Sequence, residues 1–470
     1  MSASGESHWT EQFIAKVADG KQAPNPASFP EPSHLSNSYW IREFLVDFED
    51  KWAKAPAPET VDVAIIGSGI TGATVTYQLA ESRPELKVAL FEARGLCTGA
   101  TGRNGGHIGR PEAHGMIDQA QICGVEETLR LRRFAKINRE LMLETIEKLD
   151  AVEEVDLSVK GTLIVFEDDE ERQAYVNDLA FAKKHGLETE GFVVDSDWVL
   201  KRVNIEPSFA QYGGAYLEIS GTIYLRKFVA LLLRKALERM KSFSVHPYTP
   251  VSQVTFDPEL QDNQYGVVTT KGTIRAKVVV HATNGYASHL LPSMATEKGV
   301  VGCISHMLGV SPNLIDTAVQ LEGGFGYASF WHWILQRPNK GPYLYGFATA
   351  EKMGDYNDTT SLEQTRPVRS DMLAFLSKCF PHSFSTQTTE KDICYDWTGV
   401  QGFTIDGSSI VGRPEAERRG EFVSIGHNGE GMGRCFACST VLAEAVIAQL
   451  DNKTDWEPPA WFPHSYRRNL

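Results

Sequence analysis

Several features that would place the protein in a special class are missing from the sequence. No run approaches about 18 consecutive apolar residues, so we expect no transmembrane helix. The first residues, MSASGESHWTEQF, lack a basic region followed by an apolar core and do not predict a secretory signal. The C-terminus, Arg468-Asn469-Leu470, falls short of a Ser-Lys-Leu-type peroxisomal address. We therefore expect a cytoplasmic protein rather than a peroxisomal one.

Cysteine and positive charge are also scarce. The 470 residues include seven cysteines, an odd number spread along the chain, which fits reduced thiols better than a disulfide framework. Cys435 and Cys438 form a C-x-x-C pair without a second ligand pair nearby, so we interpret them as small residues on a helix face and predict no metal site. The net charge of −14 argues against nucleic acid and anionic membranes as partners.

One stretch carries a strong motif. An apolar run, Val61 to Ile66, is followed by Gly67, Gly69 and Gly72 in the order G-x-G-x-x-G, then by a helical pattern and a second apolar run that Glu92 closes. A tight turn at Gly67, a close phosphate approach at Gly69 and close helix packing at Gly72 explain the glycines. The helix N-terminus attracts phosphate, and Glu92 can accept hydrogen bonds from ribose hydroxyls.

This spacing predicts a dinucleotide-binding βαβ unit. A purely structural βαβ unit with a glycine turn is the alternative. The carboxylate of Glu92 disfavours a 2′-phosphate and hence NADP, but the motif alone does not separate FAD from NAD.

The remaining chain predicts two α/β domains, since 470 residues are too many for one simple core. Residues 1–60 predict an arm that packs on the body through Trp9, Phe13, Trp40 and Phe44, with a helix from Asn37 to about Trp52. Further predicted helices span 73–82, 117–150, 168–187, 195–203, 226–240, 368–379 and 433–450. Predicted strands span 159–167, 243–245, 251–256, 265–270, 273–275, 277–284, 391–398, 408–411 and 421–426.

Segments whose backbone can lie against a ligand recur at 67–72, 98–106, 282–285 and 426–433. FAD is long and needs contributions from several strand ends, whereas NAD needs one compact domain. A single G-x-G-x-x-G also argues against a reductase with a second nucleotide site. The recurring backbone segments and the single motif therefore favour FAD.

The chain resembles the FAD-dependent oxidoreductase family that contains D-amino acid oxidase, glycine oxidase and sarcosine oxidase, and within it the γ-glutamylputrescine oxidase-like branch. The matching stretches are VAIIGSGITGATVTYQLA with FEA at 91–93, TGATGRNGGHI at 98–108, KVVVHATNGYASHLLP at 277–292, WILQRPNKGPYLYG at 333–346, YDWTGVQGFTIDGSSIVG at 395–412 and SIGHNGEGMG at 424–433.

The resemblance implies an α/β fold with a Rossmann-type, glutathione-reductase-like FAD-binding domain and a second, antiparallel-sheet substrate domain. We divide the chain into the arm (1–60), FAD-binding parts (61–110, 215–300 and 391–455), substrate-domain parts (111–214 and 301–390) and a tail (456–470). The residues predicted to bind FAD are Gly67, Gly69, Ile70, Thr71, Gly72, Glu92, Ala93, Arg94, Thr98, Ala100, Thr101, Gly102, Arg103, Asn104, Gly105, Gly106, Val251, Ala282, Thr283, Asn284, Gly399, Gly429, Glu430, Gly431 and Met432.

Two details of this set matter for the chemistry. Backbone N–H groups at Gly429, Gly431 and Met432 would face the flavin N1–C2=O, where negative charge develops on reduction. A carboxylate there opposes reduction, so Glu430 either points away or binds a cationic amine. We expect noncovalent FAD; relatives with a cysteinyl link have the cysteine near the position of Cys394, and a small buried thiol is the alternative there.

The family reaction is oxidation of a C–N bond in a small amine or amino acid by hydride transfer to flavin N5, with oxygen reduced to hydrogen peroxide. A dehydrogenase with another acceptor and a non-catalytic FAD-binding protein are the alternatives. Candidate substrate contacts are His107, the aromatic pair Trp331 and Trp333, and Arg337 for a substrate carboxylate. Structural roles are the alternative for each: a hydrogen-bonded histidine, core packing, and a solvated arginine in a turn.

Overall fold

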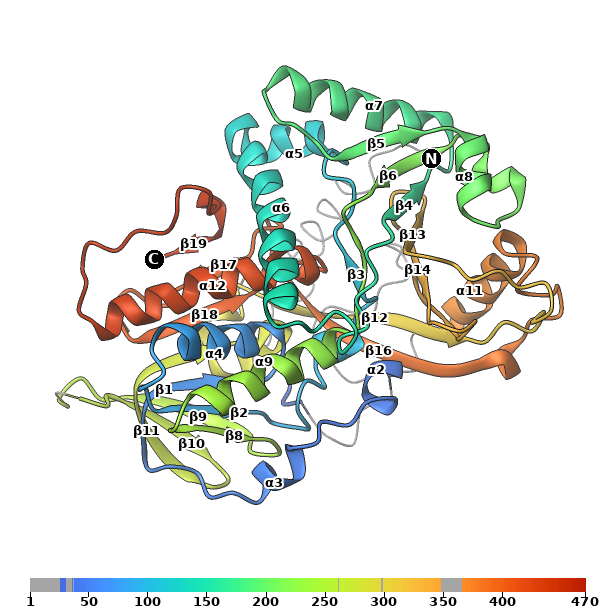
Figure 1. The fold of residues 1–470 in the computed structure, drawn as a ribbon. Helices are drawn as coiled ribbons and strands as arrows, with labels where there is room; N and C mark the ends of the chain where they lie inside the picture. The colour runs from blue at the N-terminus through green and yellow to red at the C-terminus, as the bar shows by residue number, and fades with distance from the viewer. Residues whose placement is uncertain (1–25, 31–35, 37, 261, 297–298, 348–365) are drawn as a thin grey trace.

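The computed structural model describes residues 26–30, 36, 38–260, 262–296, 299–347 and 366–470, and every structural statement below concerns these residues. Two large sheets dominate the molecule, one of nine strands and one of eight, with a two-stranded ribbon, β3 (His107–Ile108) and β7 (Gly221–Thr222), near the junction. Figure 1 shows the first sheet at the lower left and the second sheet towards the upper right, with helices packed against both.

The first sheet is built around β1, which is parallel to both of its neighbours, β2 and β11. Its path of strands is β19 (Arg467–Arg468), β17 (Ile410–Gly412), β18 (Glu421–Ile425), β11 (Gly272–His281), β1 (Thr60–Ile66), β2 (Val88–Phe91) and β8 (Phe243–His246). A meander of β9 (Val251–Phe256) and β10 (Tyr265–Thr269) branches from β11. The central strands are apolar on both faces because both faces are covered.

Three helices cover one face of this sheet: α4 (Ile70–Ser82), α9 (Leu225–Arg239) and α12 (Gly431–Leu450) (Figure 1). By length and composition α12 is apolar enough to cross a membrane, a test that core helices also pass. Most of α12 is buried, with side chains from Cys435 to Ala448 packed into the largest core.

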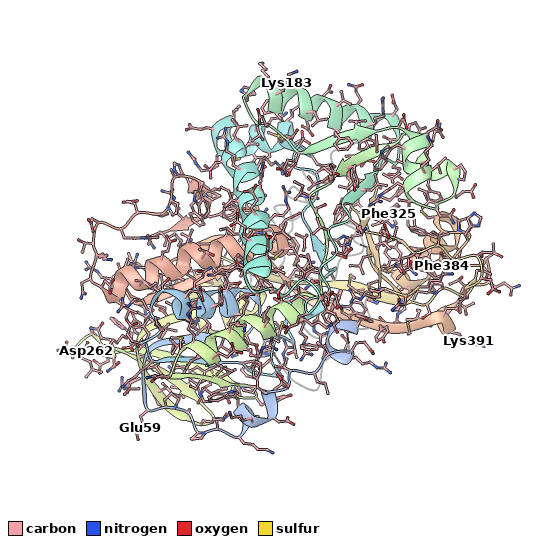
Figure 2. All side chains as sticks on the ribbon, viewed as in Figure 1. Glu59, Lys183, Asp262, Phe325, Phe384 and Lys391 are labelled. Carbon is pink, nitrogen blue, oxygen red and sulfur yellow. The ribbon has the colours of Figure 1, made fainter. Side chains whose placement is uncertain are left out.

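The second sheet is antiparallel except where β4 and β13 pair in parallel. Its order is β16 (Ile393–Phe403), β12 (Val301–Val310), β15 (Tyr343–Phe347), β14 (His332–Gln336), β13 (Gly324–Tyr327), β4 (Thr162–Val165), β6 (Gly214–Leu217) and β5 (Gly191–Val194). Helix α11 (Arg366–Cys379) packs on it, and Phe325 and Phe384, labelled in Figure 2, lie in the core between them.

The remaining helices connect and flank the sheets. They are α2 (Tyr39–Arg42), α3 (Glu49–Ala53), α5 (Met116–Cys123), α6 (Val125–Lys148), α7 (Asp169–Lys184), α8 (Ser196–Arg202) and α10 (Ala287–Leu290), with short 3₁₀ turns at 100–103, 207–210, 284–286, 292–294, 390–392 and 464–466.

The predicted fold class and the βαβ unit are confirmed. Two helix predictions are wrong. The helix expected at 117–150 is broken at Gly124, whose φ of +80° ends α5 and begins α6. Of the helix expected from Asn37 to Trp52, Asn37 lies outside the described residues and the rest forms only the short α2 and α3. A continuous helix would use the carbonyls of Ile41 and Phe44, but the Arg226 guanidinium binds them.

Two of the expected domain boundaries need correction. Residues 391–455 were assigned to the FAD-binding domain, but β16 at their start pairs with β12 along the second sheet, from Ile393 opposite Val310 to Phe403 opposite Val301. The tail, 456–470, is not separate, since β19 joins the first sheet beside β17. In the arm, Trp40 and Phe44 pack on the body as expected, while Trp9 and Phe13 lie outside the described residues.

Candidate active site

A cavity of about 660 Å³ lies between the two sheets. Its first-sheet wall is made by the carboxyl ends of β1, β2 and β11, where open parallel sheets bind their ligands. Its second-sheet wall comes from β12, β14 and β16. The cavity is therefore long and is lined by segments from most of the chain.

The glycine motif does what its spacing predicts. Gly67 has a φ of +107°, and a Cβ there would lie 2.5 Å from the Ala282 carbonyl oxygen. A Cβ on Gly72 would lie 2.0 Å from the Gly67 carbonyl oxygen, so only glycine lets α4 pack this closely on β1. Gly69 is the N-cap residue of α4 and has no side chain that could cap the helix. The Ile70 amide instead donates to the Thr101 hydroxyl (3.0 Å).

Glu92 is held in place at the end of β2. Its carboxylate accepts hydrogen bonds from the Ser68 amide (3.1 Å), the Ser68 hydroxyl (2.7 Å) and the Arg94 amide (3.1 Å). Three donors on four lone-pair positions leave room for a further donor, which suits a ribose hydroxyl. The predicted residues that line the cavity are Gly67, Gly69, Ile70, Thr71, Glu92, Ala93, Arg94, Ala100, Thr101, Arg103, Asn104, Gly105, Gly106, Val251, Ala282, Thr283, Asn284, Gly399, Gly429, Glu430, Gly431 and Met432.

Three predicted cofactor residues stand behind this lining. Gly72 packs against β1, Thr98 donates its hydroxyl to the Gly95 carbonyl, and Gly102 packs on the Cys97 carbonyl. These residues shape the walls rather than face the cavity. Arg103 faces it only in part, because its guanidinium donates to Thr98, Ser36 and Thr398. Burial lowers the pKa of Arg103 to about 10.

The turn before α12 points the start of this helix towards the cavity. Asn428 and Gly429 have positive φ (52° and 75°), which turns the chain sharply into the helix. The Asn284 amide oxygen accepts from the Gly426 amide at 2.9 Å and so joins this turn to the end of β11. No side chain caps α12 at Glu430, and the positive end of the helix faces the cavity. Such a terminus suits the developing negative charge of a reduced flavin.

These features fit FAD. Glycines form a cradle that side chains would fill, and two helices, α4 and α12, point N-termini at the cavity whose N-cap residues make no side-chain cap hydrogen bond. The Thr283 hydroxyl is buried without a hydrogen-bond partner among the described residues. Gly67 to Thr71 with Glu92 would hold the ADP half, and Gly429 to Met432 the flavin end. The loop at 98–106 would run between them.

His107 lies beside the flavin end and has no partner for either ring nitrogen among the described residues. The ring is buried, with the Phe330 ring at 5.3 Å and nearly perpendicular. Burial lowers the pKa of His107 to about 4, so the imidazole is neutral near pH 7. A buried imidazole that lacks partners and borders a cavity is suited to a hydrogen bond with a bound molecule. The alternative of a hydrogen-bonded structural histidine does not fit.

The aromatic pair faces the cavity as predicted. Trp331 and Trp333 line it, while His332 points to the opposite side of β14, against Phe375 and Tyr345. Strand alternation explains why His332 and Trp333 face opposite sides of β14, while Trp331 lies in the turn before this strand. The Trp333 indole fills the space left by Gly105 and Gly346, where Cβ atoms would lie 2.7 and 2.1 Å from its ring.

Arg337 does not line the cavity. Its guanidinium binds Asp156 (2.6 Å) and the Tyr39 hydroxyl (3.2 Å) and stacks on Trp40 and Tyr224. A buried, fully engaged arginine fits neither the predicted substrate contact nor the alternative of a solvated side chain. The long-range partners that bury it gave no signal in the sequence.

An ion pair missed by the sequence reasoning lies next to the flavin turn. Arg110 Nη2 is 2.9 Å from Glu430 Oε1, and both side chains are partly exposed in the cavity. Glu430 thus has a cationic partner from the protein, which offsets its charge near the flavin end. Arg110 ends the glycine-rich stretch that follows the βαβ unit, and that position was its only sequence signal.

The arm supplies further lining residues that no motif marked. Phe29 and Pro30 border the cavity, and the Phe29 ring packs edge-on against His289. Ser38 donates to the Gly102 carbonyl (2.6 Å) and the Trp40 indole to the Asn104 carbonyl (2.7 Å). The arm therefore holds the 98–106 loop from outside.

The cysteines give no support for a covalent link at Cys394, which is exposed on β16 and outside the cavity lining. Cys435 and Cys438 are buried in α12. All seven cysteines are free, and no group of three or more His, Cys, Asp or Glu side chains in the described ranges could hold a metal ion.

Comparison with known proteins gives a consistent result. The family described as FAD dependent oxidoreductase matches residues 62–445. The chain is 24% identical to a glycine oxidase from Geobacillus kaustophilus over 382 residues, covering 79% of this chain and 89% of the relative. It is 27% identical to the probable oxidoreductase OrdL of Rhizobium meliloti over 266 residues, which cover 56% of this chain and 58% of that relative.

Solved structures show the same fold. The crystal structure of glycine oxidase from Geobacillus kaustophilus superimposes with a TM-score of 0.64 at 21% identity, covering 85% of this chain and 97% of that one. The L-proline dehydrogenase from P. horikoshii gives a TM-score of 0.64 at 20% identity, covering 87% and 98%. With the family match spanning most of the sequence and the cavity fitting its cofactor, the chain belongs to the FAD-dependent oxidoreductases and is an enzyme of that family.

Proposed function

We propose that the protein oxidises a C–N bond of a small amine or amino acid, using noncovalently bound FAD as hydride acceptor at flavin N5 and oxygen, reduced to hydrogen peroxide, as the final acceptor. The product imine is hydrolysed to a carbonyl compound in water. We further propose that the enzyme acts in the cytoplasm.

The observation that carries this proposal is the composition of the cavity beyond the flavin turn. It combines a neutral histidine (His107), an aromatic wall (Trp331 and Trp333) and an ion pair (Arg110 with Glu430). An aromatic wall attracts the cationic or apolar part of an amine. Arg110 can bind a carboxylate with two parallel hydrogen bonds, and Glu430 can bind an ammonium group.

The protein's own part in the reaction is orientation and electrostatics. The backbone amides at the start of α12 stabilise negative charge at the flavin end without reorganising. His107, uncharged, can donate or accept one hydrogen bond to the substrate nitrogen without adding a positive charge. The neutral amine is the form that can lose a hydride, so we expect the rate to rise with pH as the substrate amine deprotonates.

Two similar proteins support chemistry at a C–N bond: one is a glycine oxidase and the other an L-proline dehydrogenase. Their names indicate different electron acceptors, oxygen for the oxidase and another acceptor for the dehydrogenase. A dehydrogenase with another electron acceptor is therefore the second candidate. A non-catalytic FAD-binding protein is disfavoured by the unpartnered His107 and the open aromatic wall.

The test is anaerobic mixing of the purified holoenzyme with a panel of primary and secondary amines and amino acids of both chiralities. Bleaching of the flavin absorption by any of them supports C–N oxidation, and a flavin that stays oxidised throughout the panel contradicts it. Oxygen consumption and hydrogen peroxide release with the bleaching amine then distinguish an oxidase from a dehydrogenase.

A further inference from the structure

The hairpin turn between β13 and β14 has an unusual backbone. Three consecutive residues, Ala328, Ser329 and Phe330, have positive φ values of 52°, 54° and 65°. None is a glycine, and runs of left-handed residues are disfavoured for L-amino acids because Cβ crowds the following carbonyl. Such a turn persists only where its surroundings hold it.

The turn forms part of the cavity wall. Ser329, Phe330 and Trp331 all line the cavity, and the Phe330 ring packs edge-on against His107. Gly326 makes room for that ring, since a Cβ there would lie 2.2 Å from it. The conformation of this turn therefore decides where two aromatic side chains stand relative to a bound substrate.

A single buried carboxylate, that of Glu171, holds the turn through hydrogen bonds. Glu171, in the first turn of α7, accepts hydrogen bonds from the Ser329 amide (2.5 Å) and the Ser329 hydroxyl (3.0 Å) through one oxygen. Its other oxygen accepts from the Glu167 amide at 2.7 Å. The Ala328 amide is also tied, to the Val165 carbonyl of β4 at 3.2 Å. Glu171 lies outside the cavity lining and is 7% exposed.

We propose that Glu171 is a positioning residue: by holding Ser329 it keeps the 328–331 turn left-handed and so fixes the Phe330 and Trp331 wall on the substrate side of the cavity. The proposal deepens the proposed function and rests on it, because the molecule that the wall contacts is the substrate of that function. A buried carboxylate with three donors is well suited to this task, because charge-assisted hydrogen bonds are the strong ones. The wall bears on substrate binding and leaves the cofactor segments untouched.

The variants follow from the contacts. Glu171→Gln keeps the size and shape of the side chain but offers one acceptor oxygen in place of two. Glu171→Ala removes all of its hydrogen bonds to the turn. Glu170→Gln, an identical chemical change at the exposed neighbouring position of α7, is the matched control. Ser329→Ala removes only the hydroxyl contact and should act more weakly than either change at Glu171.

Two readouts are needed. Amide hydrogen exchange in the holoenzyme should accelerate about tenfold or more across residues 327–332 in Glu171→Gln, and further in Glu171→Ala, with no change in Glu170→Gln. With an amine that bleaches the wild-type flavin, KM should rise about tenfold while kcat changes less than about twofold, the pattern of lost binding rather than lost chemistry. The flavin content should equal that of the wild type.

Unchanged exchange in Glu171→Gln would overturn the proposal, and so would faster exchange with an unchanged KM. A parallel loss of kcat, flavin content and melting temperature would also overturn it, since that pattern belongs to a general structural role. If no amine bleaches the wild-type flavin, the proposed function fails, while the exchange experiment still decides whether Glu171 holds the turn.

Discussion

Replacement of Trp40 tests whether the N-terminal arm holds the cofactor loop. The Trp40 side chain is 1% exposed, donates its indole N–H to the Asn104 carbonyl at 2.7 Å, and packs against Tyr224 with ring centroids 4.8 Å apart. Its ring also fills the space beside Gly106, where a Cβ would lie 2.9 Å away. Loss of this side chain therefore loosens the loop that borders the cavity.

The size of the effect follows from what each change removes. Trp40→Phe deletes one buried hydrogen bond and some ring area, which costs about 1 kcal/mol. Trp40→Ala leaves a cavity and costs about 3 to 5 kcal/mol. Because the Asn104 segment lines the cavity, we expect the loss to appear in FAD affinity as well as stability, and about 1 kcal/mol corresponds to roughly a fivefold rise in Kd.

The assay is a fluorescence titration of flavin-free protein with FAD, beside melting curves measured with and without excess FAD. Trp198→Phe is the matched control, because Trp198 packs on Tyr216 in the second sheet's core and does not touch the loop. If Trp40→Phe lowers the melting temperature but leaves the Kd for FAD equal to that of the control, the arm does not hold the loop.

Three further outcomes follow from the site. Gly72→Ala should yield protein with little flavin absorbance, because its Cβ would meet the Gly67 carbonyl at 2.0 Å. A flavin content equal to that of the wild type would contradict the packing argument. Arg110→Gln leaves the Glu430 carboxylate without its Arg110 partner beside the flavin end, and the extra negative charge opposes flavin reduction. Dye-coupled reduction should therefore show a flavin reduction potential more negative by about 30 mV or more. A reduction potential equal to that of the wild type would disprove this role of Arg110. Burial lowers the pKa of His332 and of His427 to about 3 each, below the ordinary value near 6.5, so these groups take up protons only on unfolding and the melting temperature should fall as pH drops from about 6.5 towards 4. Burial also raises the pKa of Glu171 to about 6 and raises the pKa values of Asp178 and Glu444, which acts in the opposite direction. Four buried histidines outweigh these three carboxyls, because burial lowers the pKa of His107 and His246 as well, to about 4 each. A melting temperature that is flat or rising over that range would contradict the assignment of buried neutral histidines.

The structural features that could be predicted from the sequence are those that depend on the spacing of residues close together in the chain. The glycines at 67 and 72 report directly on a turn and on helix packing, because a side chain at those positions has no room. The strands around them are apolar on both faces, which marks buried parallel strands. The opposite facings of His332 and Trp333 follow from strand geometry once β14 is known, whereas Trp331 lies in the turn before that strand.

The parts that were missed depend on partners far apart in the chain. Arg337 meets Asp156 across 181 residues, and Trp40 meets Asn104 across 64, so neither pair leaves a local pattern. Arg110 and Glu430 belong to different segments that only the folded cavity brings together. The left-handed turn at 328–330 could not be predicted from the sequence either, because it contains none of the glycines that usually mark positive φ.

The central claim is that this chain binds FAD in the cavity between its two sheets. The most direct test is an absorption spectrum of the purified protein before and after acid precipitation. We predict flavin bands near about 370 and 450 nm, with the yellow colour released into the supernatant as noncovalent FAD. A colourless protein that takes up no added FAD would contradict the claim, and colour that stays in the pellet would contradict the noncovalent attachment.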